Sequence, residues 1–261
     1  DSPVQVEHHL AQAEPHPYLL RVQGSALLQN AVIQDPAFYP ATRFGLSPDE
    51  VGQLLRQPAV QGRPPAGFHV HHGSEMNRLS TFKNIADGLA GLARASGFDS
   101  PCINLGGGWH LLSDHEIDEA LRYARKLFPE PCEILFEPGR WYTEQTGFAA
   151  GTIRNISRSG EIVRCTLDLS GKSHLHWSSC SMMHEFDARH ENGSIVQFFG
   201  PSCYESDFIG KYFMPCTDDV LVDAGLGYGR RVWFSHVSSY SVEWNTAFNG
   251  IPEVDVQWVC L

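Results

Sequence analysis

The sequence predicts an α/β domain with parallel strands over residues 1–145 and a mainly antiparallel β domain over residues 146–261. Two observations support this fold class. Short apolar runs alternate with amphipathic helical patterns up to about residue 140, an order typical of βα units. After about Thr146 strong helical periodicity is absent, and apolar runs are joined by turn signals such as Ser159-Gly160.

The α/β half is expected to contain four parallel strands. They are residues 18–22, 68–71, 102–105 and 133–136. Ser2, Ser47 and Ser113 carry helix-capping signals, and residues 79–95 repeat apolar side chains at helical spacing. The helix that follows Ser113 is expected to bury Leu121. Four strands do not close an eight-stranded barrel, so we expect an incomplete barrel with unpaired strand edges.

The β half is expected to contain six strands. They are residues 149–156, 162–169, 194–199, 220–222, 231–235 and 257–260.

Composition limits the possible functions. Apolar residues make up 42% and charged residues 19%, as in a globular protein, and the net charge of −11 argues against a nucleic-acid or membrane partner. No apolar run reaches ~18 residues, and the first residues do not resemble a signal peptide. The 7 cysteines form no CxxC pair, so we expect a reduced, cytoplasmic protein.

Three glycine-containing motifs follow predicted strands. They are His71-His72-Gly73-Ser74, Gly106-Gly107-Gly108 and Glu137-Pro138-Gly139-Arg140. Ligands of parallel α/β structures bind at the carboxyl ends of strands, so the motifs are expected to face one site. The triple glycine suits a phosphate group, although a tight loop without a ligand is an equally open interpretation.

Two His-x-His pairs, His69 with His71 and His174 with His176, have two interpretations. They are either hydrogen-bonded core histidines or metal ligands. No acidic or cysteine ligand falls at a supporting spacing, so no metal site is predicted. In the β half, the turn-rich segment around Cys203 favours an accessible thiol over a buried one, and Tyr240 alone indicates a packed aromatic.

Taken together, these motifs resemble the fold-type III decarboxylases that depend on pyridoxal 5′-phosphate (PLP), the class of ornithine, diaminopimelate and carboxynorspermidine decarboxylases. The matching stretches are Asp1-Ser2, Arg43-Phe44-Gly45, 68–74, 104–108, 137–140, 200–203 with Asp207, and Tyr240 with Phe248-Asn249-Gly250. The resemblance implies the C-terminal part of an alanine-racemase-like (β/α)8 barrel, followed by a sandwich- or barrel-like β domain.

The resemblance also implies roles for individual residues. The implied cofactor-binding residues are His71, Ser74, Gly106, Gly107, Gly108, Glu137, Gly139, Arg140 and Tyr240. Among them, His71 would stack on the pyridine ring, Glu137 would pair with its nitrogen, and the others would hold the phosphate or orient the site. The implied catalytic residues are His71 and Cys203. Cys203 would return a proton to the carbon atom that has lost carbon dioxide. The implied substrate-binding side chains are Arg140, Tyr204, Glu205 and Asp207.

Two departures from the family pattern matter. The family's cofactor lysine lies on an early barrel strand, and none of Lys83, Lys126, Lys172 and Lys211 occupies such a strand end. We therefore expect a missing or separate N-terminal segment to supply this lysine. Tyr204 stands where the ornithine and diaminopimelate branches usually carry an acid, so the substrate is expected only to be a polar or basic α-amino acid.

The expected assembly is a homodimer or a heteromer with the lysine-bearing chain. Three alternatives stay open: a non-catalytic regulatory homologue, an amino-acid racemase with Tyr204 as base, and, more distantly, a zinc hydrolase that uses the histidine pairs.

Overall fold

The computed structural model describes residues 1–14, 16–28, 42–73, 76–98, 100–183, 193–214 and 226–259. The chain divides into two compact units, Asp1–Trp141 and Tyr142–Leu261, a few residues before the predicted boundary at 145. Each unit is described by itself. The predicted strand at 220–222 and the predicted phosphate ligand Ser74 lie outside the described residues.

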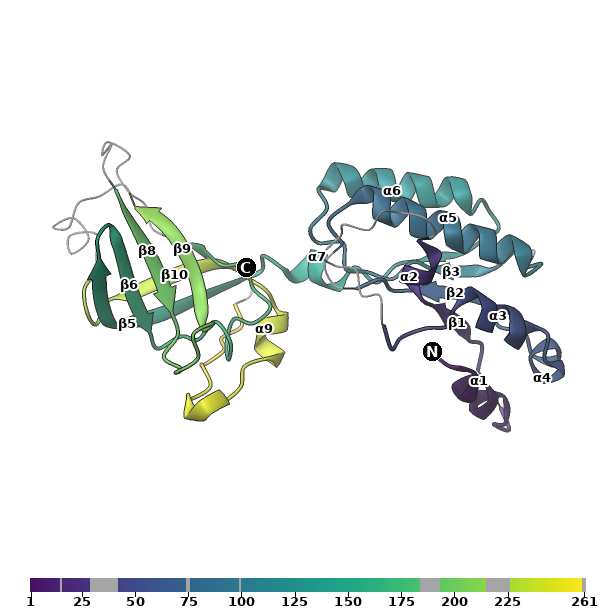
Figure 1. Ribbon diagram of the computed structural model, residues 1–261, viewed down its shortest axis with the longest axis horizontal. Coiled ribbons are helices and arrows are strands. Elements are labelled where there is room, and N and C mark those ends of the chain that lie inside the picture. The colour runs from purple at the N-terminus through teal and green to yellow at the C-terminus, as the bar shows by residue number, and fades with distance from the viewer. Residues whose placement is uncertain are drawn as a thin grey trace. The chain divides into compact units, whose positions relative to one another are not determined.

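The first unit is built on a parallel sheet (Figure 1). Its strands are β1 (Leu19–Val22), β2 (Gly67–Val70), β3 (Cys102–Asn104) and β4 (Ile134–Leu135), in the order β1-β2-β3-β4. All three pairings are parallel, which confirms the predicted βα arrangement. The helices are α1 (Pro3–Leu10), α2 (Gly24–Leu27), α3 (Pro48–Leu55), α4 (Pro58–Gly62), α5 (Leu79–Ala95) and α6 (Asp114–Leu127).

Helices α5 and α6 run side by side over the sheet (Figure 1). The apolar stripe of α5, which includes Phe82, Ile85 and Leu89, is buried in the same core as Phe68 of β2. The predicted burial of Leu121 is wrong, because this side chain is 39% exposed. The stripe of α6 is narrower than predicted, and Leu121 lies at its solvent edge.

Three serines begin helices as predicted. Ser2 accepts a hydrogen bond from the amide of Gln5, while Ser47 and Ser113 each form a capping box with a glutamate three residues on. Each cap satisfies amide groups that a helix leaves unbonded at its start, so these helix boundaries follow from local chemistry.

The second unit is a single curled sheet of six strands (Figure 1). The strands are β5 (Gly147–Ser159), β6 (Ile162–Leu167), β7 (Ser181–Met182), β8 (Ser194–Phe199), β9 (Phe208–Met214) and β10 (Arg231–Val237), in the order β7-β10-β5-β6-β8-β9. The pair β6–β8 is parallel and the other pairs are antiparallel, so the sheet is mixed. Two short helical segments, α9 (Tyr240–Glu243) and η1 (Phe248–Gly250), lie outside the sheet, and α7 (Gly139–Thr143) includes the last residues of the first unit and the first residues of the second.

Two strand predictions in this unit are corrected. Residues 251–259 form no strand, and Trp258 is exposed, so the apolar run at 257–260 lacks a partner strand in the described residues. Strand β9 was not predicted, because Gly210 and Lys211 interrupt its apolar pattern and several of its side chains are exposed at the sheet edge. In the described ranges, no helix has both the length and the apolar character to cross a membrane.

The capping box of α6 gives a prediction for stability. Ser113→Ala removes the side-chain oxygen that accepts from the amide of Glu116, so we expect a loss of about 0.5–2 kcal/mol in the free energy of unfolding. Urea unfolding followed by circular dichroism measures the change. The exposed Ser80→Ala in α5 is the control and should stay within about 0.5 kcal/mol of wild type; equal stability of the two variants would contradict the role of the cap.

Candidate functional site

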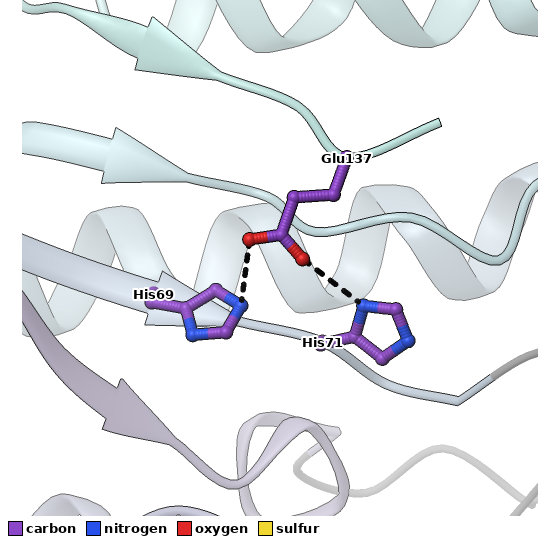
Figure 2. Close-up of side chains that lie close together, drawn as sticks. All are labelled: His69, His71 and Glu137. Carbon is purple, nitrogen blue, oxygen red and sulfur yellow. Dashed lines mark ion pairs between the residues drawn. The ribbon is translucent and has the colours of Figure 1, made fainter. Parts of the chain in front are cut away.

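Three neighbouring strand ends of the first unit bring polar side chains together. His69 lies in β2, with His71 just beyond it, while Asn104 ends β3 and Glu137 follows β4. In the sheet register His69 is opposite Asn104, and Asn104 is opposite Leu135. Because side chains two residues apart on a strand point to the same face, both histidines reach toward Glu137 (Figure 2).

The Glu137 carboxylate lies between the two imidazole rings (Figure 2). Its Oε1 is 3.7 Å from Nε2 of His69, and its Oε2 is 3.6 Å from Nδ1 of His71. These distances suit ion pairs but exceed the range of a hydrogen bond. The Glu137 side chain is 48% exposed, so one side of the carboxylate is accessible to a ligand.

Asn104 holds the carboxylate in place. Its Nδ2 donates to Oε1 of Glu137 at 2.9 Å, and its Oδ1 accepts from the amide of Gly106 at 2.9 Å. One amide side chain therefore fixes both the acid and the glycine loop. No role was predicted for Asn104 from the sequence, although its place at a strand end, two residues before the triple glycine, could have indicated one.

The glycines at 106 and 107 are required by close packing. Gly106 has φ +66°, and a β-carbon at Gly107 would clash with the carbonyl oxygen of Glu137. The amide of Gly106 donates to Asn104, and the amide of Gly107 donates to Nδ1 of His71 at 3.2 Å. This arrangement supports the tight-loop interpretation. The phosphate contacts of these amides stay a prediction. To bind a phosphate oxygen, the amide of Gly107 would have to give up its hydrogen bond to His71.

Burial favours the neutral form of both imidazoles. Burial lowers the pKa of His69 and of His71, the positive charge of Arg21 lowers both further, and Glu137 opposes these effects. Arg21 lies opposite His69 on β1, with its guanidinium over the Phe44 ring at 4.6 Å. Arg21 was not predicted as a site residue either, since nothing in the apolar run of β1 marks it as part of a site.

The predicted loop residues of the second unit gather around Asp207. Its buried carboxylate accepts hydrogen bonds from Ser170 Oγ at 2.9 Å and Ser202 Oγ at 2.7 Å. This burial weighs against a direct contact between Asp207 and a substrate. The hydrogen bonds of Asp207 instead hold the loop in its conformation. On that loop Cys203 and Tyr204 are exposed, as the expected accessible thiol requires.

The remaining predicted residues are distributed over both units. Glu205 is exposed on the Asp207 loop, and Tyr240 is exposed at the start of α9. Gly139 and Arg140 begin α7, and the amide of Gly139 donates to the Glu137 carbonyl at 2.9 Å. The structure thus unites His71, Gly106, Gly107 and Glu137 in the first unit, and Cys203, Tyr204, Glu205 and Asp207 in the second.

The second His-x-His pair does not form a site. His174 is buried, accepts from the Ser170 amide through Nδ1 and donates to the Pro252 carbonyl through Nε2. The ring of His176 stacks on Trp244 with centroids 4.8 Å apart. The core interpretation is therefore confirmed for His174.

Comparison with protein families gives one clear match. The family described as "Pyridoxal-dependent decarboxylase, pyridoxal binding domain" matches residues 3–144. Diaminopimelate decarboxylase of Deinococcus radiodurans is 26% identical over 175 residues, which are 65% of this chain and 45% of that protein. Diaminopimelate decarboxylase of Haemophilus influenzae is 25% identical over 184 residues. The chain thus spans less than half the length of these curated relatives.

Solved structures show the same fold. The arginine decarboxylase of Paramecium bursaria Chlorella virus has a TM-score of 0.76 at 18% identity, over 99% of this chain and 70% of the viral chain. Lysine/ornithine decarboxylase of Vibrio vulnificus has a TM-score of 0.72 at 15% identity, over 97% and 66%. These neighbours confirm the predicted fold class, an incomplete barrel followed by a β domain.

The contact between Gly107 and Glu137 gives a second prediction. Gly107→Ala forces the loops after β3 and β4 apart, so we expect a loss of about 1–3 kcal/mol in the free energy of unfolding. The control is Gly91→Ala in α5, where a β-carbon meets nothing within 4 Å, and where alanine should stabilise the helix by up to about 1 kcal/mol. Opposite shifts in the urea midpoint are expected; a Gly107→Ala protein as stable as wild type would refute the close approach.

Proposed function

Because this chain belongs to the pyridoxal-dependent decarboxylases, we propose that it forms part of an enzyme that removes the α-carboxylate of a polar or basic amino acid, with PLP as cofactor. One observation carries the proposal. The Glu137 carboxylate, fixed by Asn104, stands beside the His71 ring at the carboxyl ends of parallel strands. Ligand sites of parallel α/β proteins lie at this end of the sheet.

The residues present fit this cofactor. PLP offers a flat aromatic ring with one basic nitrogen, and the site offers an imidazole ring next to a half-exposed carboxylate. When bound, PLP supplies an electron sink for the bond that loses carbon dioxide. Glu137 would hold a proton on the ring nitrogen, and the orientation of its carboxylate depends on the hydrogen bond from Asn104. His71 would pack against the ring face and leave its present contact with the Gly107 amide.

Cys203 would act at a later stage. The carbon atom that loses carbon dioxide must regain a proton, and an accessible thiol can deliver it as a general acid. Cys203 is exposed on a loop that Asp207 holds through Ser202, so the thiol is presented on an ordered segment. Tyr204 and Glu205, exposed on the same loop, would contact the substrate side chain together with Arg140, and Tyr240 would contact the phosphate.

The amine that binds the cofactor would come from a segment or chain outside residues 1–261. Lys83 lies in α5 and pairs with Glu119 of α6 at 2.6 Å, and Lys126 lies in the last turn of α6. Lys172 and Lys211 lie in the second unit. Among the described residues, β1 and β4 are the outer strands of the four-stranded sheet, with one bridge from Val22 to Leu46 beyond β1, and further strands of a barrel would extend both edges.

The proposed assembly follows from this account. The lysine-bearing segment completes the barrel, and a homodimer or heteromer brings the Cys203 loop to a cofactor site. The proposed location is the cytoplasm, with which the free cysteines of the described part agree.

Release of carbon dioxide tests the proposed activity. The natural assembly, or this chain co-expressed with the lysine-bearing segment, is given carboxyl-labelled ornithine, lysine, arginine and diaminopimelate. The proposal expects PLP-dependent release from at least one of them, and expects Glu137→Gln to abolish most of it. Release no greater than with the Glu137→Gln protein for every substrate would overturn the decarboxylase assignment.

A thiol substitution tests the role of Cys203. Cys203→Ser keeps the shape but weakens the acid, so kcat should fall by about 10²–10⁴-fold with KM little changed. Cys132→Ser, the same change at a half-buried thiol in the first unit, is the control and should keep wild-type kcat. A Cys203→Ser enzyme with wild-type kcat would assign the proton to another group.

A further inference from the structure

We infer that His69, His71 and Glu137 form a binding site for a divalent transition metal ion such as Zn²⁺, with one imidazole nitrogen from each histidine and one carboxylate oxygen as ligands. These three ligand atoms lie within 4.8 Å of one another (Figure 2). Spacing along the sequence did not predict the site, because the acidic ligand comes from a strand end two positions away in the sheet.

The distances suit a single ion. Zinc binds imidazole nitrogen and carboxylate oxygen at about 2.0–2.2 Å, which in tetrahedral geometry separates two ligand atoms by roughly 3.4 Å. The observed separations are 3.7 Å from Nε2 of His69 to Oε1 of Glu137 and 3.6 Å from Nδ1 of His71 to Oε2, so each histidine is paired with a different oxygen of the carboxylate. Small side-chain rotations therefore complete the site. Two imidazoles and a carboxylate form the ligand set that zinc and related metals accept, with a further position left for water.

Each histidine turns one ring nitrogen toward the Glu137 carboxylate. Nε2 of His69 is buried and makes no hydrogen bond within the described ranges, and the proposed decarboxylase chemistry does not use this residue. Nδ1 of His71 accepts from the Gly107 amide at 3.2 Å, which places the ring proton on Nε2, so a metal ion bound at Nδ1 would take the place of this hydrogen bond. Nδ1 of His71 and Oε2 of Glu137 are both acceptors and lie 3.6 Å apart, so a cation could replace the Gly107 amide as the group that binds Nδ1 and contact the carboxylate at the same time.

The surroundings both support and oppose a cation. Asn104 donates a hydrogen bond to the carboxylate and so orients it, as the hydrogen-bond partners of metal ligands do. Arg21 brings a positive charge near the same group, and its guanidinium is turned toward Asp1 Oδ1, 3.5 Å away, and the Phe44 ring. Two nitrogen ligands favour a transition metal ion at this site. They disfavour Ca²⁺ and Mg²⁺, which prefer oxygen ligands.

The metal would share His71 and Glu137 with PLP, so the two ligands would exclude each other. This consequence rests on the proposed function. The metal site itself does not, and the following test uses the metal alone.

Cobalt(II) is the probe, since it takes the place of zinc and its visible absorption reports the coordination geometry. The full 261-residue chain is titrated with Co²⁺ and then with Zn²⁺, alongside His69→Gln, Glu137→Gln and the control His115→Gln, an exposed histidine of α6. We expect intense tetrahedral or five-coordinate bands in wild type and the control, and their loss on addition of Zn²⁺. Each ligand variant should bind the metal at least about tenfold more weakly than wild type.

Three results would overturn the site. They are the absence of such bands in wild type, bands of equal strength in both ligand variants, and thiolate charge-transfer absorption that assigns the metal to cysteines. The two ligand variants report independently, so a folding defect in one, detected by circular dichroism, leaves the other to decide.

Discussion

The hydrogen bond from Asn104 to Glu137 is the interaction on which the site depends. It joins the ends of β3 and β4, and through the amide of Gly106 it also holds the glycine loop. A half-exposed carboxylate would otherwise sample several rotamers. It could then bind neither a ring nitrogen nor a metal ion in one fixed geometry. The parallel sheet makes this bond possible, because it brings the carboxyl ends of three strands to one edge.

In the second unit an acidic side chain also holds a loop in place. There a buried acid, Asp207, organises a loop by accepting hydrogen bonds from serine hydroxyls, and the reactive candidate Cys203 remains exposed beside it. The Glu137 carboxylate is thus available to a ligand, whereas the Asp207 carboxylate holds a loop of the protein. Burial, rather than residue type, separates the two roles.

Much of the fold could be predicted from the sequence, since it depends on local chemistry. The bounds of α5 follow from its apolar period and those of α6 from its capping box. Three features could not be predicted, because they depend on which other segments pack against them. They are the exposure of Leu121, the presence of β9 and the absence of a strand at 257–259. For the site, His71 and Glu137 were found from motifs, whereas Asn104 and Arg21 matter only through contacts across the sheet.

The most direct test of a PLP enzyme is to trap the cofactor on its lysine. The purified natural material is reduced with borohydride, and intact masses are taken under denaturing conditions. We expect a lysine-bearing polypeptide or segment that carries the added mass of reduced PLP. If only the 29.1 kDa chain is found and it carries no adduct, the proposed cofactor chemistry is contradicted.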